Sequence, residues 1–291
     1  MATVEHLAQI LALTRISNRE VTQPQRVIAL LDSGVEGALE LVDPNVLTPQ
    51  VEVFGQARAD IGSWLADGIQ IVSVEDDLYP HQLAQVREAP ALIYCQGELI
   101  AEDRAVAVVG SRDASSRALV NARRISHELV AQGYTVASGL AAGIDTAAHK
   151  AALEVGGRTV AVMGTGIYKT YPVTNIKLRQ GIIERGGLVL TQFEPNQGPT
   201  KFTFPMRNAV MSGYSLATIV VEASEHSGTR VQAKKALLHG KNVILLTPVV
   251  EQTQWAKDML ANPGVYQAHD MAQLRDILSQ IEENHKILAA V

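Results

Sequence analysis

The sequence of 291 residues contains a single cysteine, Cys95, and no apolar run that approaches the ~20 residues of a membrane-spanning helix. One cysteine allows no disulfide within the chain, which fits a reducing compartment. Cys95 has no cysteine partner nearby, so we interpret it as structural rather than nucleophilic. The first seven residues lack the basic start and apolar core of a secretory signal, and we therefore expect a cytoplasmic protein without a membrane partner.

An excess of positive charge is also absent. The chain has 25 lysines and arginines against 30 aspartates and glutamates, a formal net charge of −5. Any nucleic-acid site must therefore be a local basic pocket in an acidic background. An apolar content of 47% indicates a globular protein with one large or two modest domains.

The usual cofactor fingerprints are missing as well. The chain contains no G-x-x-x-x-G-K-[ST], and the turn that starts at Gly110 reads G-S-R-D-A-S instead of G-x-G-x-x-G. NAD and P-loop ATP are accordingly not expected. His127, His149, His226 and His239 are isolated, without the paired spacing of metal ligands. The sequence thus predicts no cofactor and no metal.

Residues 1–66 show apolar residues at helical spacing. Thr22-Gln23-Pro24-Gln25 predicts a helix start, because proline is favoured in the first turn. Ser33-Gly34 predicts a stop, and Thr48-Pro49 the start of a further helix that runs to Ala66. Basic residues are few, so we interpret this part as a helical interaction or packing module.

From residue 67 to about 250, short β-branched or apolar runs are separated by glycine turns and helical segments. Alternation of this kind predicts a doubly wound α/β sheet, and residues 251–291 are expected to form a mostly helical tail. The expected strands are 68–74, 91–95, 106–109, 134–137, 159–163, 187–190, 217–221 and 242–246. The expected helices between them are 119–132, 146–155, 175–185, 208–215 and 230–239.

Polar, glycine-containing turns follow several of these strands. The carboxyl ends of parallel strands meet at the edge where α/β sheets bind ligands. Glycines let the backbone approach a phosphate, and free N–H groups at a helix start attract anions. The sequence therefore predicts a phosphate or nucleotide site, the alternative being purely structural turns. The turn residues are Gly110, Ser111 and Arg112; Ser138 and Gly139; Gly164, Thr165 and Gly166; and Ser227, Gly228 and Thr229.

Residues 191–207 have neither helical nor strand period, and their end interleaves cations with aromatics. Lys201, Phe202, Phe204 and Arg207 lie here, followed by Asn208. Aromatic rings that stack on bases, beside cations that hold the backbone, are typical of single-strand binding. The alternative is that the rings anchor a loop while the charges are solvated, and composition alone slightly favours it.

Asp145 with His149, and Glu222 by itself, are the candidates for catalytic residues. Asp145 and His149 stand one helical turn apart, and we interpret them as a structural pair that pins the second glycine turn, with acid–base catalysis as the alternative. Glu222 ends a buried strand, but no nucleophile with its base accompanies it. We therefore expect no enzymatic activity.

An ordered set of motifs runs along residues 69–248. They are Tyr79-Pro80, Ala89-Pro90 with the strand to Gly97, Gly110-Ser111-Arg112, Ser138-Gly139 with Gly143, Asp145 and His149, Gly164-Thr165-Gly166 with Tyr171-Pro172 and Asn175, Phe204-Pro205 with Arg207-Asn208, and Glu222-Ala223 with Ser227-Gly228. In this order they resemble the DNA-processing protein A (DprA/Smf) family.

The resemblance implies an extended Rossmann-like, doubly wound, mostly parallel sheet (67–250) preceded by a small all-α domain (1–66). It also implies a homodimer that binds single-stranded DNA and assists loading of the RecA recombinase in natural transformation. The family's DNA-holding roles fall here on Arg112, Lys201, Phe204 and Arg207.

The chain departs from the family at several positions. Ala209 follows Asn208 where the family has another arginine, and Arg230 is a candidate to compensate for it. The tail 251–291 shows no evident winged-helix domain. A more distant resemblance to Rossmann-like nucleotide binders and glycosidic-bond cleaving enzymes leaves an alternative, a small-nucleotide sensor or nucleotide-processing enzyme.

Overall fold

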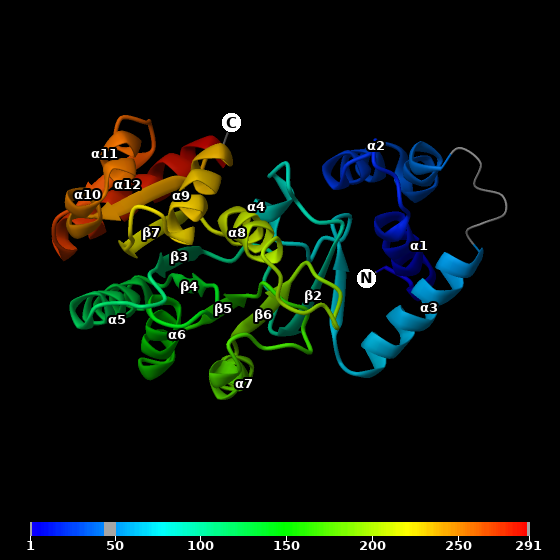
Figure 1. Cartoon of the computed structure of the whole chain (residues 1–291), viewed down its shortest axis with the longest axis horizontal. Helices are drawn as coiled ribbons and strands as arrows, with labels where there is room; N and C mark the ends of the chain where they lie inside the picture. The colour runs from blue at the N-terminus through cyan, green and yellow to red at the C-terminus, as the bar shows by residue number, and fades with distance from the viewer. Residues whose placement is uncertain (1, 44–50, 290–291) are drawn as a thin grey trace.

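The computed structural model describes residues 2–43 and 51–289, and Figure 1 shows a helical N-terminal part beside an α/β part. The first part contains α1 (Val4–Arg15), α2 (Gln23–Val42) and α3 (Val51–Ala66). The expected start at Thr48-Pro49 lies outside the described residues. The Thr22 N–H donates to Gln25 Oε1 at 2.8 Å, which supports the expected start of α2. The expected stop at Gly34 interrupts α2: its φ of 70° and ψ of −179° are not helical, so α2 consists of two helical pieces joined at a kink.

Among the described residues, nine strands form one sheet in the order β1-β2-β6-β5-β4-β3-β7-β8-β9. From β6 to β9 all neighbours are parallel, whereas β1 and β2 add an antiparallel pair next to β6. The α/β fold with a mostly parallel sheet behind N-terminal helices is thereby confirmed. The strands are β1 (Gln70–Ser73), β2 (Leu92–Gly97), β3 (Ala105–Gly110), β4 (Thr135–Ser138), β5 (Thr159–Val162), β6 (Leu188–Thr191), β7 (Ala217–Glu222), β8 (Asn242–Leu246) and β9 (Val265–Ala268).

Helices cover both faces of the sheet, because the side chains of each strand alternate. In β3, Val106 and Val108 pack with α5 (Ser116–Ala131), α6 (Ile144–Glu154) and α12 (Met271–Ala289). Ala107 and Val109 belong to the core that also contains α8 (Thr203–Tyr214) and α9 (Gly228–Leu238). Figure 1 shows α5 and α6 on one side of the strands and α8 and α9 on the other. Burial on both faces explains the continuous apolar runs of the central strands.

The remaining helices are short. They are α4 (His81–Ala84), the 3₁₀ helix η1 (Val173–Asn175), α7 (Ile176–Glu184), α10 (Thr247–Gln252) and α11 (Gln254–Met259).

The sheet continues past residue 250, where the sequence predicted a tail that is mostly helical. Strand β9 pairs with β8, so this segment extends the sheet before α12 begins. Only Ala268 of its four residues is fully buried, and a run this short and half-exposed shows no strand period.

Helix α8 begins at Thr203, five residues before its expected start. Thr200 Oγ1 accepts from the N–H groups of Phe202 and Thr203, which ends the preceding loop. Pro205 lies in the first turn, where its missing N–H removes no helical hydrogen bond. The prediction of an irregular segment up to residue 207 is therefore wrong, and Phe204 and Arg207 are helical.

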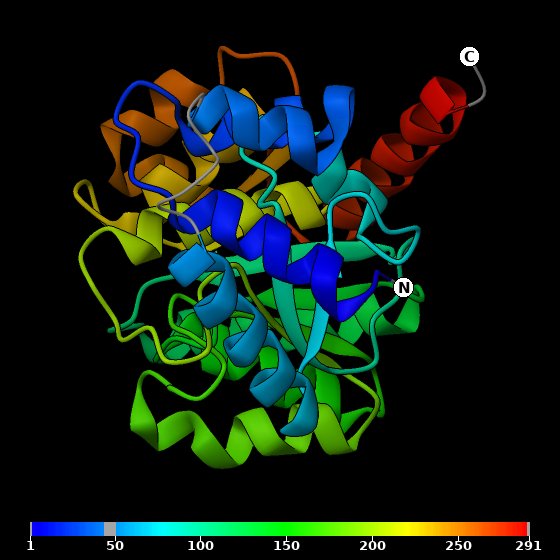
Figure 2. The same cartoon turned by 90° about the vertical axis from the view of Figure 1, so that its right-hand side faces the viewer.

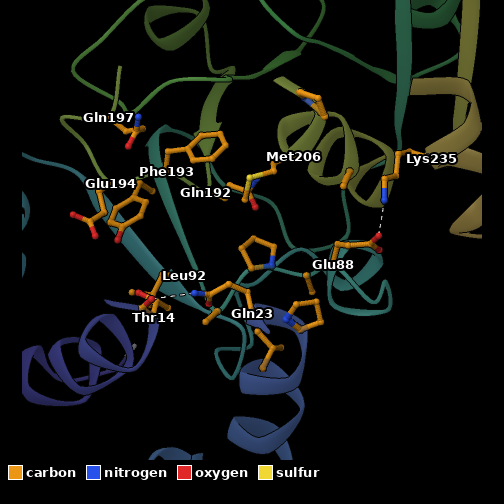
Figure 3. A pocket seen from close by; sticks show the side chains of 18 of the residues that line it. Thr14, Gln23, Glu88, Leu92, Gln192, Phe193, Glu194, Gln197, Met206 and Lys235 are labelled. Atoms are coloured by element: carbon orange, nitrogen blue, oxygen red, sulfur yellow. Dashed lines mark hydrogen bonds and ion pairs between the residues drawn. The ribbon is translucent and has the colours of Figure 1, made fainter. Parts of the chain in front are cut away.

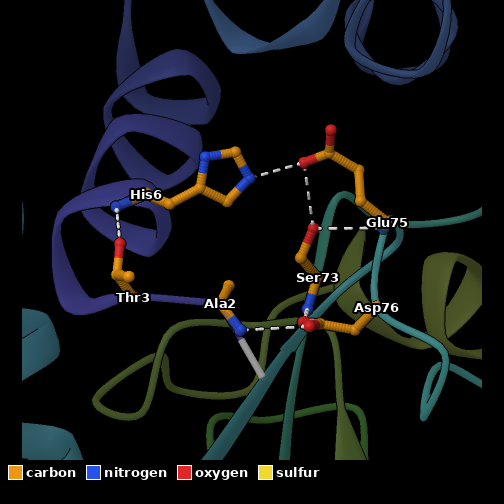
Figure 4. Close-up of polar contacts among 6 residues, drawn as sticks. All are labelled: Ala2, Thr3, His6, Ser73, Glu75 and Asp76. Carbon is orange, nitrogen blue, oxygen red and sulfur yellow. Dashed lines mark hydrogen bonds and ion pairs between the residues drawn. The ribbon is translucent and has the colours of Figure 1, made fainter.

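The N-terminal helices pack against the antiparallel end of the sheet, and Figure 2 shows α1 and α3 in front of its strands. Figure 4 shows polar contacts at the start of α1: the Ala2 N–H donates to Asp76 at 3.1 Å, and His6 Nε2 lies 2.7 Å from Glu75. At the other end of α1, Arg15 binds both carboxylate oxygens of Glu194, at 2.9 and 2.7 Å. These contacts hold the helical part to the sheet at both ends of α1.

Candidate nucleic-acid interface

The strand order reverses at β3. After β3 the chain builds β4, β5 and β6 on one side and then returns to β7 on the other. Ligands of open α/β sheets bind beyond the carboxyl ends of the strands at such a switch point. A cavity of about 450 Å³ lies there, which we call the switch-point cavity. Its lining is Val109, Gly110, Ser111, Arg112, Asp113, Ala141, Asp145, Phe204, Arg207, Asn208, Met211, Ser227, Gly228, Thr229 and Gln232.

The first turn, Gly110-Ser111-Arg112, is held in place by Glu222 at the end of β7. The Ser111 N–H donates to the Glu222 carbonyl at 3.0 Å. The Glu222 carboxylate accepts from the N–H of Ser115 at 3.0 Å and from its hydroxyl at 2.6 Å. Ser115 is the N-cap of α5, so Glu222 joins the turn, the helix start and β7. Glu222 thus has a structural role.

The second turn is pinned by Asp145, as expected. Its Oδ2 accepts from the N–H groups of Gly139 at 3.1 Å and Ala141 at 3.3 Å. Burial raises the pKa of Asp145. The Ser138 hydroxyl is fully buried and donates to the Val108 carbonyl at 2.7 Å, so the sheet itself uses this group.

The expected pairing of His149 with Asp145 is wrong. His149 is fully buried, and its Nδ1 lies 2.7 Å from Thr159 Oγ1 on β5. Thr159 donates its own proton to the Val136 carbonyl, so the imidazole must be the donor to Thr159. Burial, with a contribution from Arg207, lowers the pKa of His149 to about 3, and the ring is neutral.

Arg207 occupies the floor of the cavity with 6% of its surface exposed. Its Nη1 donates to the carbonyls of Gly139 at 2.5 Å and Val162 at 2.9 Å, and its Nε to Asn208 Oδ1 at 3.1 Å. A Cβ on Gly139 would come within 1.7 Å of Nη1, so only glycine leaves room for this arginine. Burial lowers the pKa of Arg207, but a guanidinium keeps its proton at neutral pH. A buried positive charge therefore joins the ends of two strands to α8.

Arg112 and Phe204 form an exposed cation–aromatic wall of the cavity. Arg112 Cζ lies 4.9 Å from the centroid of the Phe204 ring, and Arg112 is exposed. Tyr171 packs on Phe204 with 5.8 Å between the ring centroids. A Cβ on Gly164 would meet the Phe204 ring at 2.7 Å. The third turn therefore supports the aromatic ring from behind.

The structure brings nine of the sixteen residues proposed from the sequence to the cavity lining. Lys201 lies outside it, exposed on the loop before α8, with its Nζ 5.0 Å from the Phe202 ring centroid. Arg230 also lies outside, 4.0 Å from Glu225. Thr165 donates its hydroxyl to the Lys169 carbonyl. Seven of the sixteen do not line the cavity: Ser138, Gly139, Gly164, Thr165, Gly166, Lys201 and Arg230.

Gln232 is one of six lining residues that the sequence-based proposal lacked, together with Val109, Asp113, Ala141, Asp145 and Met211. It follows Gly228 by four residues and thus lies one helical turn along α9, on the same side. The four-residue spacing from a glycine turn at a helix start is the signal by which the sequence could have indicated Gln232.

A larger cavity of about 860 Å³ lies between the N-terminal helices and the α/β part. Figure 3 shows Gln23 of α2, Phe193 and Glu194 beyond β6, and Met206 of α8 around it, with Lys235 Nζ 2.6 Å from Glu88. None of the four glycine turns contributes to this lining. The smaller cavity is the better candidate site, because the exposed Arg112 and two of the four strand-end turns line it.

Within residues 2–43 and 51–289, no group of three or more histidine, cysteine, aspartate or glutamate side chains is placed to hold a metal ion. No helix in this described part has the length and apolar character needed to cross a bilayer.

Comparison with known proteins assigns a family. The model of the family described as DNA recombination-mediator protein A matches residues 70–282. The chain belongs to this family. The DNA processing protein DprA of Streptococcus pneumoniae is 39% identical over 175 residues, 60% of this chain and 61% of that protein. Protein Smf of Escherichia coli is 37% identical over 177 residues, 60% of this chain and 47% of that protein. The matches thus span about half to three fifths of these curated relatives.

Solved structures agree with the family at the level of the fold. The DprA structure from S. pneumoniae superposes with a TM-score of 0.75 at 27% identity, covering 95% of this chain and 98% of that one. The DNA processing protein A from Helicobacter pylori, described for its single-stranded DNA binding mode, gives a TM-score of 0.62 at 22% identity, covering 74% of this chain and 97% of that one.

Proposed function

We propose that this protein binds single-stranded DNA at the switch-point cavity without catalysing a reaction on it. The observation that carries the proposal is the exposed Arg112 guanidinium, 4.9 Å over the Phe204 ring, at the mouth of a cavity whose floor holds the buried Arg207. Arg112 contacts a backbone phosphate, and the part of the Phe204 ring that Arg112 and Gly164 leave open contacts a base. A cation beside an aromatic face is the arrangement that single strands require, since only unpaired bases can stack on protein.

The charge distribution supports a small number of phosphate contacts. The chain is acidic overall, at −5, so attraction to DNA depends on the local cations. The N-terminus of α9, at Gly228 and Thr229, adds the positive end of the helix dipole to the same cavity. Lys201 and Phe202 lie exposed on the loop before α8 and extend this surface along the strand.

The test is a fluorescence-anisotropy titration of labelled oligo-dT at several salt concentrations. Arg112→Ala should weaken binding to all sequences alike and reduce the slope of log K against log salt by about 0.7, the effect of one phosphate contact on a single strand. Arg124→Ala is the matched control, an exposed arginine on α5 away from the cavity, and it should bind like the wild type. No binding by the wild type at low salt, or an Arg112→Ala variant that binds equally well, would contradict the proposal.

The proposal extends to a homodimer that assists loading of RecA onto the bound strand in natural transformation. Its support is the family, which is named for mediating recombination. Light scattering measures the oligomeric state. A RecA filament assay on strands first saturated with this protein measures loading, and filaments that form no faster than on bare DNA would remove this part of the proposal.

A mononucleotide ligand is the second candidate, because a volume of about 450 Å³ falls within the ~300–1,000 Å³ of small-molecule sites. Thermal-shift measurements with each ligand distinguish a mononucleotide site from a single-stranded DNA site. A rise of the melting temperature with mononucleotides but not with oligo-dT would favour the sensor or nucleotide-processing function.

A further inference from the structure

Gln232 is a buried amide on the wall of the switch-point cavity. Its side chain lies on α9 and only 1% of the residue is exposed. Neither its amide nitrogen nor its amide oxygen has a hydrogen-bond partner within residues 2–43 and 51–289. Buried polar atoms are nearly always paired, because an unmet hydrogen bond in the interior costs free energy. The hydroxyl of Ser227, at the start of the same helix and in the same lining, is also buried and unpaired.

The chemistry of the missing partner follows from the carboxamide. A phosphate oxygen accepts hydrogen bonds but donates none, so it could pair with the amide nitrogen and would leave the amide oxygen unpaired. A carboxamide presents a donor and an acceptor side by side in one plane. The complementary pattern is found on the edge of a nucleobase, and adenine offers it at N6 and N7, the contact that glutamine makes in protein–DNA complexes.

We infer that the switch-point cavity takes an adenine base and that Gln232 reads its edge. The inference rests on the proposed function, since the base belongs to the strand whose phosphate Arg112 contacts. Phe204 of α8 lines the same cavity, so the aromatic contact and the edge contact come from two different helices. The protein therefore prefers adenine at one position of an otherwise sequence-tolerant site.

Anisotropy titrations with oligo-dA and oligo-dT of equal length test this preference. The readout is the dissociation constant for oligo-dT divided by that for oligo-dA, compared between wild type and Gln232→Met. Dividing the two ratios cancels differences in the stacking of the free oligonucleotides. We expect the ratio to fall about tenfold in Gln232→Met, because one bidentate base contact contributes about that factor. Wild type should also lose the preference when N7 of adenine is replaced by carbon. Gln180→Met, on α7 outside the cavity, should keep the wild-type ratio.

Thermal unfolding without DNA distinguishes recognition from a structural role. Gln232→Met removes unpaired polar atoms, so the melting temperature of this variant should be no lower than that of the wild type. A lower melting temperature together with an unchanged ratio would mean that the amide only supports the fold, and it would overturn the inference. Equal binding of both oligonucleotides by the wild type would overturn it too, while leaving single-strand binding intact. No binding of either oligonucleotide by the wild type would overturn the proposed function as well.

Discussion

Replacement of Gly139 by alanine tests the contact on which the floor of the cavity depends. The added Cβ would lie 1.7 Å from Nη1 and 2.3 Å from Cζ of Arg207, so the guanidinium has to leave its place. Gly139 does not have a positive φ, so alanine is compatible with its backbone. The expected effect therefore comes from the displaced arginine rather than from backbone strain.

The magnitude follows from what Arg207 loses. Its hydrogen bonds to the carbonyls of Gly139 and Val162 are buried, and displacement leaves both acceptors and the nearby Asp145 without this cation. Breaking a buried charged network costs about 3–5 kcal/mol. At roughly 2–3 °C per kcal/mol for a chain of this size, the melting temperature should fall by about 6–15 °C.

Urea unfolding followed by circular dichroism measures the change in the free energy of unfolding. Gly181→Ala is the control, a helical glycine of α7 with open space around it, and it should leave stability unchanged or raise it by up to about 1 kcal/mol. In the double variant, Gly139→Ala should add almost nothing to Arg207→Met, because the clashing group is gone. A Gly139→Ala variant destabilised by less than about 1 kcal/mol would refute the reasoning.

Two further predictions concern buried titratable groups. The pKa of His149 is about 3 when folded and 6.5 ordinarily, so the unfolded chain binds the proton more readily. Stability from this group is complete above pH 6.5 and declines as the pH falls towards 3, by about 2 kcal/mol at pH 5. His149→Gln should show a flatter dependence of the free energy of unfolding on pH, and an unchanged slope would contradict the assignment. Burial raises the pKa of the Cys95 thiol, which is fully buried. An aromatic disulfide reagent should therefore label Cys95 only after denaturation, and fast labelling of the native protein would show that the strand opens.

The central sheet could be predicted from the sequence because its signals are local. Runs such as 106–109 are apolar on successive residues, and burial on both faces of a parallel sheet produces that pattern. The expected strand 242–246 coincides with β8. Strand β9 lacked such a run, and α8 was hidden because its first turn carries aromatic, proline and basic residues without a helical period.

The candidate site could be predicted in part. Glycine turns after strands placed Gly110–Arg112 and Ser227–Thr229 at the switch point, since chain order and parallel pairing bring those strand ends together. The pattern could not show which polar groups remain available to a ligand. Ser138 and Thr165 have the same chemistry as Ser227, but their hydroxyls donate to backbone carbonyls, whereas the Ser227 hydroxyl has no partner within residues 2–43 and 51–289.

By itself, the sequence determined the alternation of strands and helices, the glycine turns and the family. These depend on which residue types follow one another along a few turns of chain. The tertiary structure decided that Arg207 is a buried support while Arg112 faces outward, because Arg207 pairs with a carbonyl 68 residues away. It also decided that Gln232, in the cavity, has no hydrogen-bond partner among the residues that the structure describes. Hydrogen-bond partners far apart in the sequence leave no periodic trace in it, and only packing shows which groups remain free.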